Sequence, residues 1–278
     1  MTVATLSQVL HTAQHGNYAV AGLVVLGWED ARAYVEAAEE AGLPVILQAG
    51  PGSRKHTPTP ILGKMFRSLA EQASVPVVCH IDHAFTLQEC VEGLDNGFTS
   101  VMIDGSKLEI AANIALTASV AQAARTFNAS VEGEVGVVGY VNGSTSAFTS
   151  PADAQRFDRE SGADALAISI GNVHLNTEKT SGIDLGALAQ IEAATTLPLV
   201  LHGGSGIPAD VRQHLARRTR VKKFNIGTEL RMIFGQSLRH AIQAKPESFD
   251  RLELLSSTIA PMRQAAKSIM QELGPAPR

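Results

Sequence analysis

The sequence predicts one α/β domain over residues 1–278, a (β/α)8 TIM barrel with an additional C-terminal helix. Three observations predict it. Short runs rich in Val, Ile and Leu alternate eight times with longer amphipathic segments. The short runs are almost continuously apolar, as strands are when both faces of a parallel sheet are buried. The length of 278 residues exceeds the common domain size but suits a barrel, which often has about 250 residues.

Eight strand–helix pairs follow one another along the chain. Several expected strands begin after Pro or Gly and end at Gly or Ser, which are usual turn residues. We expect strands over 18–25, 43–50, 75–82, 98–104, 129–135, 163–169, 197–202 and 221–226. We expect helices over 28–42, 61–73, 86–97, 108–127, 150–162, 184–195, 208–218 and 228–243. A last helix over 260–270 covers the barrel or serves a subunit contact.

Composition excludes several functional classes. The net charge of −4 gives no basic excess, and basic residues cluster only at 217–223, so we expect no nucleic-acid partner. No apolar run approaches the ~18 residues of a membrane span, and the first 20 residues lack the pattern of an export signal. We therefore expect a cytoplasmic protein with no membrane partner. Cys79 and Cys90 are predicted to be buried without forming a disulfide.

Polar residues gather at the ends of the predicted strands, where barrels of this class place their catalytic groups. Taken singly, such residues are more often structural, and His80 is interpreted as a buried hydrogen-bonding residue. Five further histidines are interpreted as surface residues: His11, His15, His56, His214 and His240. The polar strand ends are Asp82 with His83, Asp104, Glu132 with Glu134, His174, His202 and Asn225.

Three of these residues predict a metal site. His83, His174 and His202 follow the third, sixth and seventh strands, so they should meet at one mouth of the barrel. Three protein ligands and an open position are typical of a catalytic zinc. Cobalt, iron or manganese would also suit three imidazoles. A metal there would polarise a carbonyl or stabilise an enolate oxygen.

Asp82 stands beside the first of these histidines and is a candidate for proton transfer. Adjacent strand residues face opposite ways, so we expect Asp82 or His83 to lie on the turn after the strand. The alternative is that Asp82 caps the helix that follows.

Two Gly-rich turns predict a phosphate site. "HGGSGIP" (202–208) and "NIGTE" (225–229) each open a helix, whose backbone N–H groups attract anions. The loops after the seventh and eighth strands are where barrels bind phosphate. The alternative is that both segments are only tight turns and helix caps.

Six segments together resemble the class II, zinc-dependent ketose-bisphosphate aldolases, the fructose- and tagatose-bisphosphate group, over nearly the whole chain. Their order and spacing make a chance match implausible. They are "PVVCHIDHA", "GFTSVMIDGS", "VEGEVG", "FTSPADAQRFDRESGADALAISIGNVH", "PLVLHGGSGIP" and "KKFNIGTELR".

The resemblance implies a role for each candidate residue. His83, His174 and His202 would bind Zn²⁺, and Asp82 would exchange a proton with the hydroxyl at carbon 4 of a sugar phosphate. Asp104 and Glu134 would form a second metal site or support the first. A monovalent cation is implied near the phosphate, and homodimers or homotetramers are usual. The dihydroxyacetone phosphate moiety would be held by Gly203, Gly204, Ser205, Asn225, Ile226, Gly227 and Thr228.

Four departures from the family pattern affect expected substrate contacts or proton transfer. Val24 replaces an Asn that orients substrate, Gly50 replaces a Ser, and Leu175 replaces a Gly whose carbonyl is expected near the phosphate. In the usual "GGxED" loop, the acidic residue that serves the proton at carbon 3 aligns with Asn142. An amide cannot act as a general base.

These departures leave three hypotheses. The first is an active lyase, a zinc aldolase that releases dihydroxyacetone phosphate from a non-standard ketose phosphate. Another base would replace the lost one: Glu132, Glu178 or an ordered water. The second is a slow fructose- or tagatose-bisphosphate aldolase. The third is a sugar-phosphate-binding protein without catalysis, which the retained Asp82 argues against.

Overall fold

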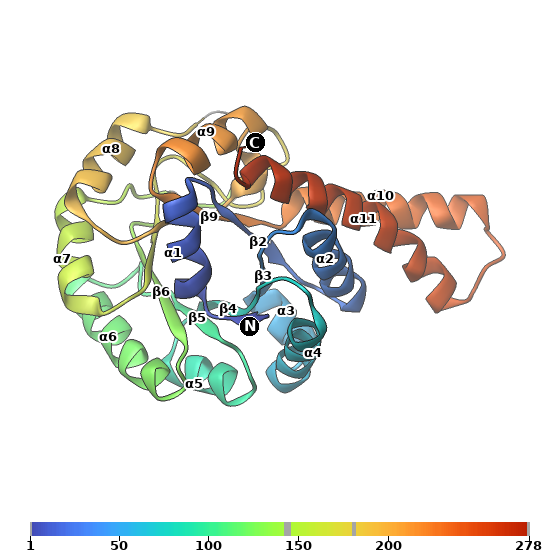
Figure 1. Ribbon diagram of the computed structural model, residues 1–278, viewed down its shortest axis with the longest axis horizontal. Coiled ribbons are helices and arrows are strands. Elements are labelled where there is room, and N and C mark those ends of the chain that lie inside the picture. The colour runs from blue at the N-terminus through green and yellow to red at the C-terminus, as the bar shows by residue number, and fades with distance from the viewer. Residues whose placement is uncertain (1, 142–145, 180–181, 277–278) are drawn as a thin grey trace.

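The computed structural model describes residues 2–141, 146–179 and 182–276, which fold into the predicted (β/α)8 barrel (Figure 1). The barrel strands are parallel and are neighbours in chain order from β2 to β9. Pairing between β2 and β9 closes the barrel. The strands are β2 (Val20–Val24), β3 (Val45–Ala49), β4 (Val77–Ala84), β5 (Ser100–Ile103), β6 (Ser130–Val135), β7 (Ala165–Ile168), β8 (Leu199–Leu201) and β9 (Val221–Ile226).

A ring of helices surrounds these strands, and each predicted helix overlaps an observed one. Side chains of Thr86, Ser150 and Asp184 accept hydrogen bonds from first-turn N–H groups of α5, α7 and α8, which fixes where these helices begin. The helices of the eight pairs are α2 (Trp28–Ala41), α4 (Thr59–Gln72), α5 (Leu87–Asp95), α6 (Ile110–Thr126), α7 (Pro151–Ser161), α8 (Leu185–Ala194), α9 (Ala209–Arg218) and α10 (Thr228–Ala244).

Four further elements were not expected from the sequence: β1 (Val3–Ala4), α1 (Leu6–Gly16), α3 (Pro51–His56) and the 3-10 turn η1 (Gly204–Gly206). The helix α1 has a clear local cause, because Thr5 and Gln8 form a capping box at its start. Its apolar face packs on inward-facing strand residues such as Val78 and Met102, so α1 lies across the barrel (Figure 1). The opposite mouth is left for the site.

The C-terminal helix α11 (Arg251–Leu273) has 23 residues, so the expected bounds of 260–270 are wrong. Asp250 caps its start by accepting from Leu252 N–H, and Pro261 lies inside the helix. A proline inside a helix removes one hydrogen bond and its ring crowds the carbonyl of residue i−4, at a cost of about 3 kcal/mol, so the packing of α11 must offset it. Here α11 packs against α2 and α10 and covers the barrel flank, as one alternative predicted. The hairpin of α10 and α11 projects beyond the barrel (Figure 1).

Two expectations from composition are met in the described part of the chain. Every described helix is either too short or too polar to cross a lipid bilayer. Cys79 and Cys90 are buried free thiols, and burial raises the pKa of each to about 12.

Candidate functional site

Successive side chains of a strand face opposite sides, and most of the polar residues lie on the side that faces one mouth of the barrel. Their neighbours in sequence, such as Ile81, Val131 and Phe224, face outward into the apolar layer under the helices. Because side chains alternate with a period of two, residues on the other face all enter the barrel interior. These inward residues are His80 and Asp82 on β4, Glu132 and Glu134 on β6, His202 after β8, and Lys223 and Asn225 on β9.

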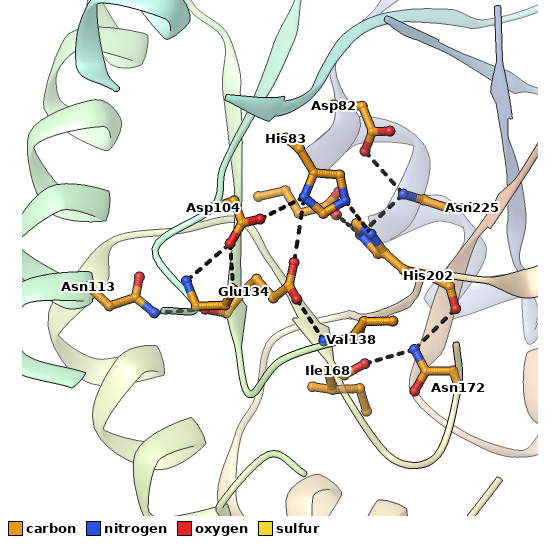
Figure 2. Close-up of polar contacts among 12 residues, drawn as sticks. Asp82, His83, Asp104, Asn113, Glu134, Val138, Ile168, Asn172, His202 and Asn225 are labelled. Carbon is orange, nitrogen blue, oxygen red and sulfur yellow. Dashed lines mark hydrogen bonds and ion pairs between the residues drawn. The ribbon is translucent and has the colours of Figure 1, made fainter. Parts of the chain in front are cut away.

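His83 breaks this alternation. The pairing of β4 with β5 shifts register between Ile81 and Ala84, and His83 has a φ of 50°, in the left-handed region. This bulge brings the imidazole to the same side as Asp82 (Figure 2). The expectation that Asp82 or His83 lies on the turn after the strand is therefore wrong. Both lie within β4, because an extra residue in a strand changes the side that the next residues face.

The structure brings the three predicted histidines together. His83 Nε2 lies 2.9 Å from His202 Nδ1. His174 lies in the segment after β7, where its N–H donates to Gly139 O at 2.8 Å and its ring stacks on Tyr140 with centroids 4.8 Å apart. One nitrogen from each of the three histidines lies within 4.8 Å of the others, so they could hold one metal ion.

Two carboxylates lie on the other side of the His83 ring (Figure 2). His83 Nδ1 is 2.9 Å from Asp104 Oδ2 and 3.8 Å from Glu134 Oε2. Burial alone would lower the pKa of His83, but the carboxylates of Asp82 and Asp104 raise it to about 9. Burial raises the pKa of Glu134 to about 7. These atoms also form a group that could hold a metal, so both predicted roles, second metal and support of His83, remain predictions.

A buried charged network lies beneath His202. Glu132 Oε1 is 3.1 Å from His202 Nε2, and Glu132 Oε2 accepts from Lys223 Nζ at 2.5 Å. His80 Nδ1 lies 2.9 Å from Ser100 Oγ, and its Nε2 lies 3.3 Å from Lys223 Nζ. Burial and the charge of Lys223 lower the pKa of His80 to about 3. The interpretation of His80 as a buried hydrogen-bonding residue is confirmed.

Asp82 lies beside His83 at the mouth of the barrel. Its Oδ1 accepts from Asn225 Nδ2 at 3.3 Å, and the same amide lies 3.1 Å from His202 Nε2. Burial alone would raise the pKa of Asp82, but positive charge on His83 and His202 holds it below its ordinary value. The residue that caps α5 is Thr86, so the alternative role of Asp82 as a helix cap is wrong.

A pocket of about 310 Å³ opens over Asp82, His83 and His174. Five of the predicted phosphate-site residues line it: Gly203, Ser205, Asn225, Gly227 and Thr228. Gly204 and Ile226 do not line it, and the Ile226 side chain packs in the apolar layer instead.

The two Gly-rich turns are joined at the pocket wall. Ser205 Oγ accepts from the N–H groups of Gly227 and Glu229, at 3.3 and 3.2 Å. Gly203 has a φ of 67°, and a Cβ there would lie 2.1 Å from Val173 O, so only glycine fits. Buried Arg212 donates to Gly204 O at 3.2 Å and to carboxylates on α10 and α11, which ties these helices to the turn. These hydrogen bonds therefore hold the two turns together.

The three departures that the structure describes all line this pocket: Val24, Gly50 and Leu175. Leu175 is half exposed and has a φ of 57°, a left-handed conformation in which glycine is more usual. A Cβ on Gly50 would lie 3.5 Å from Asp82 Oδ2, so glycine leaves space beside the carboxylate.

The candidates for a replacement base lie elsewhere. Glu132 is fully buried beneath His202 and does not line the pocket. Glu178 is exposed and also lies outside the lining. Asn142 falls outside the described residues. Among the described lining residues, Asp82 has the only carboxyl group.

The sequence matches a known protein family over almost its whole length. The family described as class-II fructose-bisphosphate aldolase matches residues 4–278. The chain belongs to this aldolase family. A group of histidines at the mouth of the barrel that could hold a metal ion agrees with that membership.

Solved aldolase structures are also similar to this chain. The chain is 28% identical to the YdjI aldolase from Escherichia coli K12, with 98% of each chain covered and a TM-score of 0.84. It also has the fold of the fructose-bisphosphate aldolase from Campylobacter jejuni, at 21% identity and a TM-score of 0.81, with 98% of this chain and 95% of that chain covered. The low identity agrees with a divergent member of the aldolase family.

Among the lining residues that sequence reasoning missed, Arg231 and Tyr140 have the largest polar side chains. Arg231 lies one helical turn beyond Thr228, so the i, i+3 spacing at the start of α10 could have revealed it. Tyr140 is found only through its stacking on His174, a contact between segments that no local pattern predicts.

Proposed function

We propose that the protein is a metal-dependent lyase that cleaves a ketose phosphate, reversibly, into dihydroxyacetone phosphate and an aldehyde. The observation that supports this most strongly is the convergence of His83, His174 and His202 beside Asp82. His83, His174 and Asp82 line a pocket together with the two Gly-rich turns, and buried His202 lies against His83. A metal site, a carboxylate and an anion site within about 310 Å³ suit carbon–carbon cleavage of a small phosphorylated sugar.

The three histidines fit a divalent metal. Their nitrogen atoms point to one region, and Glu132 lies against the outer nitrogen of His202 as partners of metal-bound imidazoles usually do. When bound, Zn²⁺ or a similar ion supplies Lewis-acid polarisation of the substrate carbonyl. His83, His174 and His202 would hold it, and Asp104 would orient His83 through Nδ1.

Asp82 would supply the proton transfer at carbon 4. In the direction of cleavage its carboxylate accepts the proton of the carbon 4 hydroxyl, the bond between carbons 3 and 4 breaks, and the aldehyde leaves. The electron pair of that bond passes to the dihydroxyacetone phosphate moiety, which takes a proton at carbon 3 from an ordered water. The proton on Asp82 then passes to the hydroxide left by that water, so the carboxylate is restored. A lowered pKa keeps Asp82 ionised and ready to accept a proton near neutral pH.

The phosphate end of the substrate would lie against the Gly-rich turns. Gly203, Ser205, Gly227 and Thr228 border the pocket there. A Cβ on Gly227 would lie 3.5 Å from a guanidinium nitrogen of Arg231, so this cation is close to the same turn. We propose Arg231 as a further phosphate ligand, and a monovalent cation nearby remains a prediction.

Much of the pocket wall is apolar. Val24, Leu26 and Leu175 line it, and Arg231 is the only Lys or Arg among the described lining residues. Residues 142–145, Asn-Gly-Ser-Thr, contain no cation either. With one cation for one phosphate, we propose ketose 1-phosphates as the substrate class, in preference to bisphosphates.

The test is a retro-aldol screen of metal-loaded protein against ketose 1-phosphates and the matching bisphosphates, with released dihydroxyacetone phosphate detected by a coupled assay. We expect release from a 1-phosphate, with a KM about 10-fold or more higher in Arg231→Gln because a charge-assisted hydrogen bond is lost. Faster cleavage of fructose or tagatose bisphosphate would favour the slow bisphosphate aldolase. Binding without any cleavage would support the non-catalytic alternative.

We also propose that the protein forms a homodimer or homotetramer. The projecting hairpin of α10 and α11 supports this, because Phe249 at its tip is 96% exposed and Leu252 is 74% exposed. Sedimentation of the wild type beside Phe249→Ser would test it, and a monomeric wild type would contradict it.

A further inference from the structure

The bulge in β4 is the one place where a candidate metal ligand reaches the site against the strand pattern. His83 should face outward, since Asp82 before it faces into the barrel. Its φ of 50° lies in the left-handed region, which is strained for a residue with a Cβ. Something must hold this conformation, because a strained backbone persists only when its surroundings over-determine it.

Arg54 contacts the backbone of this bulge directly. The residue lies on α3, and its guanidinium is largely removed from solvent, which lowers its pKa. Its Nη1 donates to Ala49 O at 2.5 Å and to Asp82 O at 2.7 Å, and its Nη2 donates to His83 O at 3.0 Å. One side chain therefore binds the end of β3 and both carbonyl oxygens of the bulge.

We propose that Arg54 is a positioning residue that sets the orientation of Asp82 and His83 by holding the carbonyl oxygens of their bulge. The pocket lining includes Gly52 and Ser53 but not Arg54, so Arg54 acts through the backbone and not on substrate. The planar guanidinium has five N–H donors in a fixed fork, and this geometry serves three carbonyls at once. A lysine ammonium could keep the charge but not this fork.

A different role for Arg54, as a second anion ligand, does not agree with its contacts. Its Nη1 already makes two hydrogen bonds and its Nη2 a third, all to carbonyl oxygens. The inference rests on the proposed function only where it concerns catalysis. The link from Arg54 to the bulge is a statement about the backbone and can be tested without substrate.

The first test compares Arg54→Ala and Arg54→Lys with the wild type, and uses Lys55→Met as the matched control. Lys55 is the next residue on α3 and is exposed. We expect Zn²⁺ affinity, measured by chelator competition, to fall ~10–100-fold in Arg54→Ala, as for other residues that orient metal ligands. The Zn²⁺ affinity of Arg54→Lys should lie between those of the wild type and Arg54→Ala, and the affinity of Lys55→Met should match that of the wild type. Wild-type affinity in both Arg54 variants would overturn the inference.

The second test needs no metal. Hydrogen exchange of a peptide covering residues 79–86 should be faster in metal-free Arg54→Ala, because the carbonyls of the bulge lose their donors, and millimolar guanidinium should partly restore protection. Unchanged exchange would overturn the inference. If Arg54→Ala does not fold, Arg54→Lys serves for the same comparison.

The third test separates positioning from a general loss of stability. At saturating Zn²⁺, with a ketose 1-phosphate that the wild type cleaves, kcat should fall in Arg54→Lys while KM stays near its wild-type value, because the phosphate turns do not contact Arg54. An increase in KM alone would contradict positioning. If the wild type binds Zn²⁺ but cleaves nothing, the proposed function fails, and the affinity and exchange measurements still decide the role of Arg54.

Discussion

The ends of β8 and β4 each bring a histidine to the same point, but they do so differently. His202 follows β8 in the regular alternation, and Glu132 and Lys223 support it from beneath. His83 reaches the site through a bulge with a left-handed residue, and its backbone is held by Arg54. One ligand is thus fixed through buried side-chain charges and the other through backbone carbonyls. Removing the charged residues beneath His202 should therefore have a different effect from changing residues of the β4 bulge.

The largest effect is expected at β4, where Asp82 lies in the pocket beside His83. Asp82→Asn should lower kcat by ~10²–10⁴-fold, because the amide cannot accept the proton of the carbon 4 hydroxyl. Zinc content, measured by atomic absorption, should stay at the wild-type value. Asp95→Asn, at an exposed position on α5, is the control. Loss of zinc from the Asp82 variant would contradict the division of roles between Asp82 and His83.

Removing the support beneath β8 should mainly affect stability. In Lys223→Met the fully buried Glu132 loses its charge partner, which costs about 3–5 kcal/mol of unfolding free energy. Denaturant unfolding of the metal-free protein measures this, with the exposed Lys64→Met as the control. If the unfolding free energy falls by less than about 1 kcal/mol, the buried network of Glu132 and Lys223 does not stabilise the position of His202.

A smaller effect compares the two histidines themselves in metal-free protein. His202→Ala leaves an oxygen of buried Glu132 unpaired, so we expect a loss of about 1–3 kcal/mol. His83→Gly leaves Asp104 Oδ2 without its imidazole partner but also removes the strain of a left-handed residue with a Cβ, so we expect a loss smaller than that in His202→Ala by about 1 kcal/mol. Both variants should lose tight Zn²⁺ binding. Equal destabilisation by the two would remove the distinction between β4 and β8.

The sequence predicts the barrel because its signal is local and repeated. Eight apolar runs with amphipathic partners identify the strands and helices, and Asp82, His174 and His202 can be found from their places at or after strand ends. The repeated strand–helix pattern does not reveal α1, because this helix precedes the first pair. The long α11 was assigned only in its second half.

What the sequence could not predict depends on contacts between distant segments. Adjacent strand residues cannot normally share one face, so the position of His83 requires a bulge that no residue type in "HIDHA" signals. Arg54 contacts carbonyls 28 and 29 residues further along the chain. The partner of His202, Glu132, is 70 residues away in sequence. These supports become visible only in three dimensions.

The central claim is that a metal held by the three histidines is required to cleave a ketose phosphate. The most direct measurement follows dihydroxyacetone phosphate release from one ketose 1-phosphate before chelation, after chelation and after Zn²⁺ is returned, with His202→Ala in parallel. We expect release to stop on chelation and to return with Zn²⁺ in the wild type only. Release that continues in the fully chelated protein, or in His202→Ala without bound metal, would contradict the claim.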